Sequence, residues 1–358
     1  MILSRSVPPA GTVRDWIDAR AETGGTAFVL PETGDTLDWP TLRATAHRIA
    51  GLLLSRGAQK GSSIAIVMPN GRPAIEALYG TLAGGFRATM INLAAGRDAI
   101  AYALEHSEAR FAFVDDSAMA LFTDAAQGLS VTRLTPAEAP DTAPDTAPDL
   151  PSLSPSDHAL LMYTSGTTGQ PKGVVHTHAS LLAGGWTTSI AHDLTPADRG
   201  LCVLPIYHIN GLCVSVMGSL VSGGSLALCS RFSASRFWDW ADQSQATWFS
   251  VVPTIISHLL HSDIDPPASV KARLRFGRSA SSPLAPDVQT AFETRFDVPI
   301  VETMGLTETA AQILSNPLPP GVRKIGSPGI PFGNEAAILG PDLQPIGADQ
   351  EGEIAVRG

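Results

Sequence analysis

Eleven consecutive residues, 163–173, combine more groups capable of chemistry than any other stretch of the chain. They read Tyr-Thr-Ser-Gly-Thr-Thr-Gly-Gln-Pro-Lys-Gly and hold four hydroxyl side chains on Ser or Thr, three glycines and one lysine. Glycine lets the backbone approach a ligand closely and turn its N–H groups towards it. Hydroxyls donate hydrogen bonds to phosphate oxygens, and lysine adds a mobile positive charge. The composition predicts a loop that binds a polyphosphate.

Three alternative assignments of this segment fit less well. A Walker A loop requires glycine immediately before its lysine and Ser or Thr after it, but Pro171 and Gly173 occupy these positions. The spacing of a dinucleotide-binding G-x-G-x-x-G turn does not occur in the segment either. A flexible Ser/Thr/Gly linker is disfavoured because apolar runs flank the loop at 159–162 and 173–175. We therefore expect a loop held between two strands.

Further stretches of the chain, taken with this loop, resemble the acyl-adenylate-forming enzymes. This family includes acyl-CoA synthetases, luciferases and the adenylation domains of peptide synthetases, and its signature loop is similar to Tyr163–Gly173. The other similar stretches are Arg56–Gly61 with Ser63–Asn70, Leu204–Gly211, Arg278–Pro283, Met304–Glu308 and Gly352–Gly358. The likeness extends over nearly the whole chain. It implies an α/β fold of two helix-covered, mostly parallel sheets, followed by the start of a small β-barrel-like subdomain.

The resemblance also implies which residues bind the substrates. The nucleotide site comprises Thr164, Ser165, Gly166, Thr167, Thr168, Gly169, Lys172, Ala280, Ser281, Ser282, Met304, Gly305 and Thr307. The acid pocket comprises His208, Asn210, Gly211, Ala280 and Gly305. The metal site for Mg²⁺ comprises Glu308 and Thr164, since magnesium needs few protein carboxylates when phosphates complete its shell. The catalytic residues are Thr164, Lys172, His208, Thr307 and Glu308.

Each of these assignments has a structural alternative. Glu308 would also suit the first turn of a helix, where the dipole favours an acid. His208 would also suit a hydrogen-bonded position without a function, and 280–283 would also suit a plain strand-to-turn sequence. Two residues depart from the family pattern: Met304 stands where many relatives carry an aromatic residue, and Ala280 where many carry glycine. Ala280, with the polarity that Ser281 and Ser282 add and a stretch at 316–324 similar to oxalate-activating enzymes, favours a short or polar acid.

The reaction implied is the attack of a carboxylate on the α-phosphorus of ATP, followed by transfer of the acyl group to coenzyme A. The substrates would be a carboxylic acid, ATP and coenzyme A, with Mg²⁺ bound to the phosphates. The family's ribose-binding aspartate and its mobile C-terminal domain find no counterpart here, so we expect a large N-terminal domain that is poorly active alone. Two alternatives are an adenylation unit for a carrier protein and a non-catalytic nucleotide- or acyl-binding module.

Composition restricts the remaining possibilities. The chain of 358 residues is 44% hydrophobic and has a formal net charge of −10, which argues against nucleic-acid binding. It lacks an apolar run long enough for a membrane span and an N-terminal secretion signal. Cys202, Cys213 and Cys229 suit buried thiols of a reducing, cytoplasmic compartment, and the histidine spacing does not suggest zinc. A homodimer is an expectation from the resemblance alone.

Alternating helical and strand patterns predict four portions along the chain. They are a first α/β portion at 1–134, a Pro/Ala/Asp connector at 135–156 whose tandem repeat at 139–149 is expected to be extended, a second α/β portion at 157–316 and a β-rich start at 317–358. The predicted helices are 40–56, 73–82, 99–105, 180–189, 211–221 and 253–261. The predicted strands are 63–68, 111–114, 201–205, 225–229, 248–252, 299–301, 335–339 and 353–356.

Overall fold

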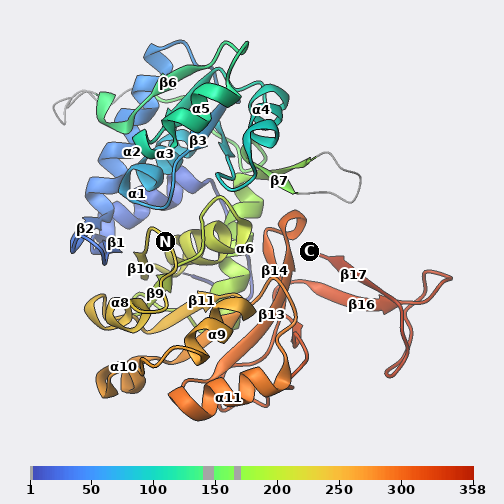
Figure 1. Cartoon of the computed structure of the whole chain (residues 1–358). Helices are drawn as coiled ribbons and strands as arrows, with labels where there is room; N and C mark the ends of the chain where they lie inside the picture. The colour runs from blue at the N-terminus through green and yellow to red at the C-terminus, as the bar shows by residue number, and fades with distance from the viewer. Residues whose placement is uncertain (1–2, 140–148, 165–170) are drawn as a thin grey trace.

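Two helix-covered sheets, lying one beside the other, form the body of the molecule (Figure 1). The computed structural model describes residues 3–139, 149–164 and 171–358. The nine-stranded sheet has the order β15-β14-β13-β12-β11-β9-β10-β1-β2, and the six-stranded sheet has the order β6-β5-β3-β4-β7-β8. The predicted α/β architecture with two mostly parallel sheets is confirmed.

The six-stranded sheet has a parallel centre and one antiparallel edge. Its strands are β3 (Ser63–Val67), β4 (Arg87–Met90), β5 (Phe111–Val114), β6 (Thr132–Leu134), β7 (His158–Thr164) and β8 (Lys172–Thr177). Its neighbouring helices are α2 (Trp39–Ser55), α3 (Arg72–Ala83), α4 (Arg97–His106) and α5 (Met119–Ala125). All five residues of β3 are buried, as expected for a central parallel strand covered on both faces. The antiparallel β7–β8 pair carries the predicted phosphate loop between its strands.

The nine-stranded sheet collects strands from distant parts of the chain. They are β1 (Thr26–Leu30), β2 (Asp35–Asp38), β9 (Arg199–Cys202), β10 (Ser225–Leu228), β11 (Trp248–Val251), β12 (Phe276–Ser279), β13 (Ile300–Leu306), β14 (Ala311–Ser315) and β15 (Ile330–Pro331). The helices are α1 (Val13–Thr23), α6 (His178–Ala191), α7 (Gly218–Ser222), α8 (Phe237–Gln243), α9 (Pro253–Leu260), α10 (Ala268–Arg273) and α11 (Pro286–Phe296). The N-terminal strands β1 and β2 therefore belong to this sheet, although 1–134 supplies most of the other one.

Helix α6 connects the two halves. It follows directly from β8 of the six-stranded sheet and contacts β14 of the nine-stranded sheet, so it lies between them (Figure 1). Ten of its fourteen residues are buried, which is typical of a helix that is covered on all sides. Its first turn is capped by the Thr177 hydroxyl, which accepts a hydrogen bond from the Ser180 amide at 3.1 Å. The site described below lies between structures that this helix holds together.

The structure adds local detail to two sequence-based expectations. The helix predicted at 211–221 is a π-helix, η3 (Asn210–Met217), that continues into the α-helical α7. In the connector, Pro136–Glu138 forms one 3₁₀ turn, whereas 140–148, which make up most of the repeat expected to be extended, lie outside the described residues. The boundaries of the four portions remain a prediction.

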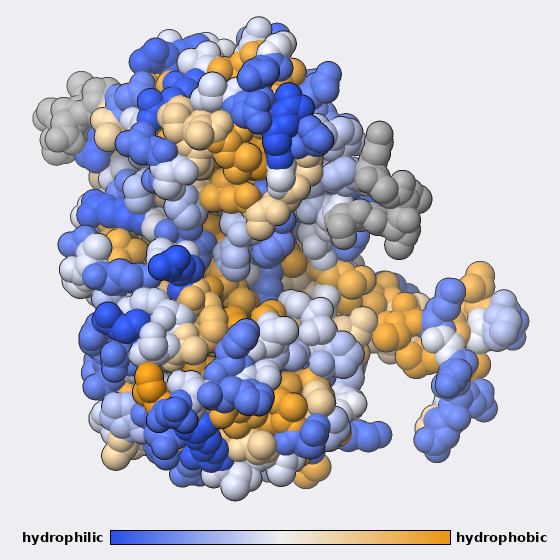
Figure 2. Space-filling view, in the orientation of Figure 1, coloured by the Kyte–Doolittle hydropathy of each residue, from blue (hydrophilic) through white to orange (hydrophobic). Residues whose placement is uncertain are grey.

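The expected β-rich start of a further subdomain is an antiparallel ribbon of β16 (Glu335–Leu339) and β17 (Glu353–Arg357). It projects from the body, and within the described residues it does not close into a barrel (Figure 1). Figure 2 shows apolar side chains on this ribbon, and Ile338, Ile354 and Val356 are among the exposed large hydrophobic residues. A two-stranded ribbon is marginally stable by itself.

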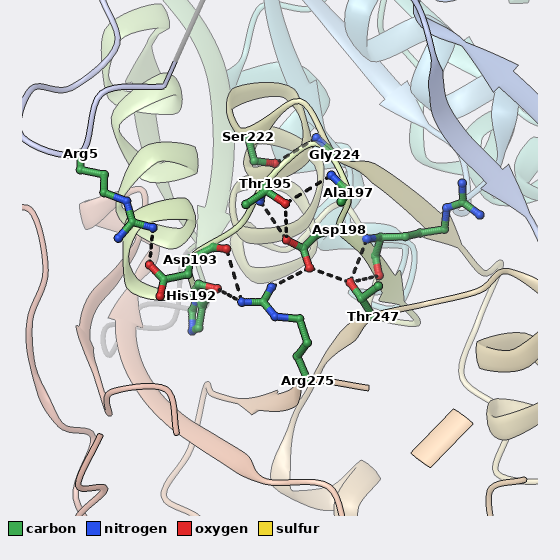
Figure 3. A network of polar contacts seen from close by, with 11 residues as sticks. Arg5, His192, Asp193, Thr195, Ala197, Asp198, Ser222, Gly224, Thr247 and Arg275 are labelled. Carbon is green, nitrogen blue, oxygen red and sulfur yellow. Dashed lines mark hydrogen bonds and ion pairs between the residues drawn. The ribbon is translucent and has the colours of Figure 1, made fainter. Parts of the chain in front are cut away.

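A polar network ties together the amino ends of neighbouring strands in the nine-stranded sheet (Figure 3). Asp198, Thr247 and Arg275 immediately precede β9, β11 and β12, respectively. The Asp198 carboxylate accepts hydrogen bonds from Arg275 Nη1 at 2.6 Å and from Thr247 Oγ1 at 2.9 Å. Its other oxygen accepts one from the Thr195 amide at 2.9 Å. These bonds satisfy a buried carboxylate within the protein and fix the relative positions of the strands whose carboxyl ends form the site.

None of the helices in the described ranges is long and apolar enough to cross a membrane.

Candidate active site

The carboxyl ends of the parallel strands open into a cavity of about 530 Å³. Ligand sites of α/β proteins favour this edge of a sheet, where loops can change without disturbing the strands. The cavity is lined by Thr164, Leu204, Pro205, His208, Ile209, Asn210, Val252, Ser281, Gly305, Leu306, Thr307 and Glu308. Thr164 comes from the six-stranded sheet, whereas the other residues come from the nine-stranded sheet and its loops. The structure thus brings together seven residues that sequence analysis assigned to nucleotide, metal and acid.

A second cavity of about 350 Å³ shares Ser281, Gly305 and Leu306 with the first. Its other lining residues are Ser282, Pro283, Glu302, Thr303, Met304, Gly326 and Pro328. Glu302 is buried, and its Oε1 accepts a hydrogen bond from the Leu284 amide at 3.1 Å. Its Oε2 is enclosed and has no partner among the described residues. An acceptor in this state fits a ligand that offers an amino group, as adenine does.

Several residues assigned from the sequence lie beside these cavities, without lining them. Lys172 is exposed at the start of β8, directly opposite Thr164 in the β7–β8 pair. Ala280 is 4% exposed, and Gly211 is buried in η3. Ser165, Gly166, Thr167, Thr168 and Gly169 lie outside the described residues. Their assigned roles in phosphate binding therefore remain predictions.

The backbone at the junction of the two cavities is unusual. Ser281 has φ of +77°, a left-handed conformation that side chains other than glycine seldom adopt. On the facing strand, a Cβ atom added to Gly305 would stand 1.6 Å from the carbonyl oxygen of Ala311. A shift in pairing register between Met304 and Gly305 accompanies this close approach. Such departures from regular structure concentrate at functional sites, where they direct backbone and side-chain groups towards a ligand.

His176 holds the short helix η4 (Thr307–Thr309) in place. Its Nε2 donates a hydrogen bond to the Thr307 carbonyl at 2.8 Å, which requires the tautomer with a proton on Nε2. Burial lowers the pKa of His176, even though this bond and the charge of Glu308 act in the opposite direction. Sequence analysis found no metal-ligand spacing among the histidines and gave His176 no role, and its spacing carries no signal for the role found here. His176 positions the two residues expected to contact phosphate and metal.

Glu308 and Thr164 face the same cavity from opposite sheets. A carboxylate and a hydroxyl are suitable protein groups for Mg²⁺, which completes its octahedral shell with substrate phosphates and water. Burial lowers the pKa of the His208 imidazole, although part of this residue is exposed. At neutral pH, His208 is therefore uncharged and offers one donor and one acceptor.

Asn70 anchors the loop that carries His208. Its Nδ2 donates hydrogen bonds to the carbonyls of Leu204 at 2.9 Å and Cys229 at 3.0 Å. Its Oδ1 accepts one from the Ile206 amide at 2.9 Å. Because Asn70 follows β3, a side chain from the six-stranded sheet fixes a loop of the nine-stranded sheet. In the sequence, only the position of Asn70 after a proline at a strand end marks it, and that does not indicate its distant partners.

The comparison with known families agrees with this geometry. The sequence profile of the family described as "AMP-binding enzyme" matches residues 16–358. The chain belongs to the AMP-binding enzyme family. The resemblance to acyl-adenylate-forming enzymes inferred from the sequence motifs is therefore confirmed.

Related AMP-binding enzymes include CoA ligases. The sulfoacetate–CoA ligase of Cupriavidus necator is 43% identical over 341 residues, covering 92% of this chain and 66% of the relative. The oxalate–CoA ligase of Arabidopsis thaliana is 31% identical, covering 87% of this chain and 64% of the relative. The crystal structure of ATP-bound MatB from Rhodopseudomonas palustris is similar with a TM-score of 0.84 and 25% identity, over 97% of this chain and 70% of that one. The chain spans about two thirds of the length of these curated relatives.

Proposed function

We propose that this chain is the acid- and ATP-binding part of an AMP-forming carboxylic acid–CoA ligase. One observation carries the proposal: Thr164 and Glu308, from two different sheets, line the same cavity as His208 and Asn210. A phosphate-binding hydroxyl, a metal-binding carboxylate and an acid pocket must meet for an acid to react with ATP. The names of the related CoA ligases support the choice of this reaction.

In the first step, a carboxylate oxygen of the acid forms a bond to the α-phosphorus of ATP. The bond from that phosphorus to the oxygen bridging the β-phosphorus breaks, and pyrophosphate leaves with the electron pair. In the second step, the sulfur of coenzyme A attacks the acyl carbon, AMP leaves, and the thiol proton is released. Both steps need correct positioning and neutralisation of phosphate charge, with little covalent participation by the protein.

The residues divide this work. Thr307 would donate to the α-phosphate, and Thr164, Lys172 and the hydroxyls of the loop would bind the outer phosphates. Mg²⁺, when bound at Glu308, neutralises phosphate charge. His208 would border the carboxylate of the acid without adding a charge of its own. His176 contributes by holding the backbone of Thr307.

A short acid with a second acidic group is the substrate class that we infer. The cavity lining carries polar groups at His208, Asn210 and Ser281, which suit a polar acid. Sulfoacetate and oxalate, named in the two relatives, are small and carry two acidic groups each. The interpretation of Ala280 as a departure that narrows the pocket and favours a short or polar acid points in the same direction.

We further propose a cytoplasmic enzyme that acts on small molecules, with homodimerisation as an expectation to be tested. Cys202, Cys213 and Cys229 are buried free thiols, which agrees with a reducing compartment. The net charge of −10 supports the absence of nucleic-acid binding.

The test is ATP–pyrophosphate exchange that depends on added acid, measured for residues 1–358 and for a chain extended to the length of the relatives. Acid-dependent exchange and formation of an acyl-CoA by the extended chain would support the ligase. Exchange without transfer to coenzyme A, but with transfer to an acyl carrier protein, would favour the carrier-protein alternative. ATP binding without exchange in either chain would favour a binding module.

A further inference from the structure

Arg278, in the centre of β12, is a buried cation without an anionic partner among the described residues. It is 1% exposed, and its guanidinium donates to Asn210 Oδ1 at 2.8 Å, Ser250 Oγ at 3.2 Å and Gln312 Oε1 at 3.3 Å. All three partners are neutral. In the part of the chain that the structure describes, no carboxylate oxygen lies within 4.0 Å of its nitrogens.

Such a burial is costly, and within the described protein three hydrogen bonds to neutral groups compensate the cost only in part. Removing a guanidinium from water costs several kcal/mol unless an opposite charge or sufficient hydrogen bonds replace the solvent. Burial lowers the pKa of Arg278 to about 9, so the side chain still carries its charge at neutral pH. Its Nη2 donates no hydrogen bond to any described residue, so the guanidinium is also incompletely hydrogen-bonded.

The positive charge is one amide group away from the acid pocket. Asn210 lines the cavity, whereas Arg278 lies behind it. The Oδ1 atom of Asn210 accepts from Arg278 Nη1 and from Ser250 Oγ, the latter at 3.3 Å. A guanidinium has no acceptor, so it fixes which end of the amide faces it. The Nδ2 end must therefore point the other way, where it donates to Ser281 Oγ at 3.3 Å.

The pocket therefore contains hydrogen-bond donors that have a positive charge directly behind them. Asn210 Nδ2 has a second hydrogen, and the hydroxyl hydrogen of Ser281 has no acceptor among the described residues. Both groups line the cavity, and its described lining contains the carboxylate of Glu308 but no lysine or arginine. His208 is neutral, so it adds no charge. Among the described residues, Arg278 is thus the cation in direct contact with Asn210, and its charge acts over a short distance on these two donors.

We propose that Arg278, acting through Asn210 and Ser281, selects acids that carry a second anionic group, a carboxylate or a sulfonate, beside the carboxyl group that is activated. The proposal rests on the proposed function and specifies its acid subsite. Asn210 and Ser281 would donate to the second anionic group, and Arg278 would supply the charge that offsets its desolvation. Arg278 is a positioning residue, because it reaches the ligand through Asn210.

The experiment compares pairs of acids of similar length, malonate with propionate and sulfoacetate with propionate, by ATP–pyrophosphate exchange in the extended chain. The unmodified chain is expected to have the higher kcat/KM for malonate and sulfoacetate. Arg278→Met keeps the volume and removes the charge, so it should lower kcat/KM for the doubly charged acids by about 10- to 100-fold, mostly through KM. The value for propionate should change by less than about threefold, and Arg278→Lys should restore part of the preference.

Two further variants separate selectivity from folding. Asn210→Ala leaves Arg278 in place and should reduce the same preference, which keeps the test valid if Arg278→Met does not fold. Arg275→Met is the matched control, because Arg275 precedes the same strand but pairs with Asp198 at the other end. It should lower stability and leave the ratio of malonate to propionate unchanged.

Each outcome decides the proposal. Equal losses for both classes of acid in Arg278→Met and Asn210→Ala would mean a purely structural role and would overturn it. A preference of the unmodified chain for propionate would also overturn it. Absence of exchange with every acid would refute the ligase function, which is a separate failure. Calorimetry with malonate and propionate on residues 1–358 would then decide the inference, since malonate binding that is no tighter than propionate binding contradicts it.

Discussion

Two arginines, one just before β12 and one near its carboxyl end, differ in the partners of their positive charge. Arg275, just before the strand, pairs with the Asp198 carboxylate at 2.6 Å and belongs to a network that joins neighbouring strands (Figure 3). Arg278, three residues later, is more deeply buried and has neutral partners alone among the described residues. At the amino ends of the strands, the protein itself supplies the negative charge that pairs with the arginine. Only the stability of the fold depends on this pair. At the carboxyl ends the counter-charge is left to a ligand.

This difference separates stability from function along the same strands. Substitutions at the amino ends should change the free energy of unfolding and leave the catalysed reaction unchanged. Substitutions around the cavity should change the catalysed reaction and leave the free energy of unfolding nearly unchanged. Active sites commonly contain groups whose arrangement is unfavourable until substrate binds. Four measurements test whether stability and function are separated between the two ends of these strands.

The largest effect is expected at the cavity. Glu308→Ala removes the carboxylate proposed to bind Mg²⁺, so acid-dependent exchange should fall by at least about 100-fold. Glu308 is exposed and its carboxylate accepts no hydrogen bond from the described residues, so the melting temperature should change by less than about 2 °C. Glu351→Ala, at an exposed loop position, is the control. Unaltered calorimetric binding of Mg·ATP by Glu308→Ala would remove this residue from the metal site.

The second effect is expected at the amino ends. Asp198→Ala removes the carboxylate that accepts hydrogen bonds from Arg275 Nη1, Thr247 Oγ1 and the Thr195 amide, and leaves Arg275 with carbonyl acceptors but no counter-charge, so it should lower the free energy of unfolding by about 2–4 kcal/mol. Urea unfolding measures this loss. Adding Arg275→Met should recover part of it, because the unpaired cation is then also removed. A large change in the malonate-to-propionate ratio at a temperature where Asp198→Ala is folded would contradict the separation of the two ends.

The third effect depends on pH. His192 is fully buried, stacks on Phe276 with ring centroids 5.1 Å apart, and burial lowers its pKa to about 3. In the unfolded chain a histidine takes up a proton near pH 6.5, so between that pH and about 3 the unfolded state binds more protons. Stability should therefore fall as pH decreases through this window, with a contribution from His192 of at most about 1.4 kcal/mol per pH unit.

Comparing the pH dependence of the unfolding free energy between variants separates the contribution of His192 from that of the other buried histidines. His192→Gln should reduce the dependence of unfolding free energy on pH between about 4 and 6. His261→Gln is the matched control, since the Nδ1 atoms of His192 and His261 make the same hydrogen bond to the carbonyl four residues earlier, at 2.8 and 2.7 Å, but His261 is exposed. If both variants alter the slope equally, burial of His192 is not the cause.

The smallest effect is expected at Asp193, which also lies in the view of Figure 3. It pairs with Arg5, but both side chains are at least half exposed. Exposed pairs contribute little, so Asp193→Ala should change the free energy of unfolding by less than about 1 kcal/mol. A loss as large as that of Asp198→Ala would show that burial does not govern the strength of this network.

Local patterns were sufficient to predict most elements and to single out residues that the structure places around one cavity. The apolar run of β3, the helical spacing of α2 and the motif ending at Glu308 each depend on neighbours in sequence. The π-helical geometry of η3 does not follow from such a pattern. A Cβ atom at Gly211 would stand 2.4 Å from the Pro205 carbonyl oxygen, so the preceding loop approaches the first turn of this helix closely.

The residues that position the site could not be found in this way. The sequence marks Arg278 only as the first residue of the family-like stretch at 278–283, because its partners Asn210 and Gln312 are 68 and 34 residues away. His176 and Asn70 likewise act through hydrogen bonds to carbonyls more than 100 residues distant. A side chain that serves distant backbone atoms has no characteristic neighbours in sequence, so only the three-dimensional arrangement identifies it.

The attachment of residues 204–206 to Asn70 has an evolutionary consequence. The main chain of this loop is held by bonds from the opposite sheet, which do not depend on the side chains at positions 208 to 210. The side chain of His208, which makes no hydrogen bond to a described residue, can therefore be exchanged while the loop keeps its course, whereas Asn210 also accepts from Arg278. An enzyme with this anchor would evolve specificity for a new acid substrate through a few point substitutions, without insertions or a remodelled backbone.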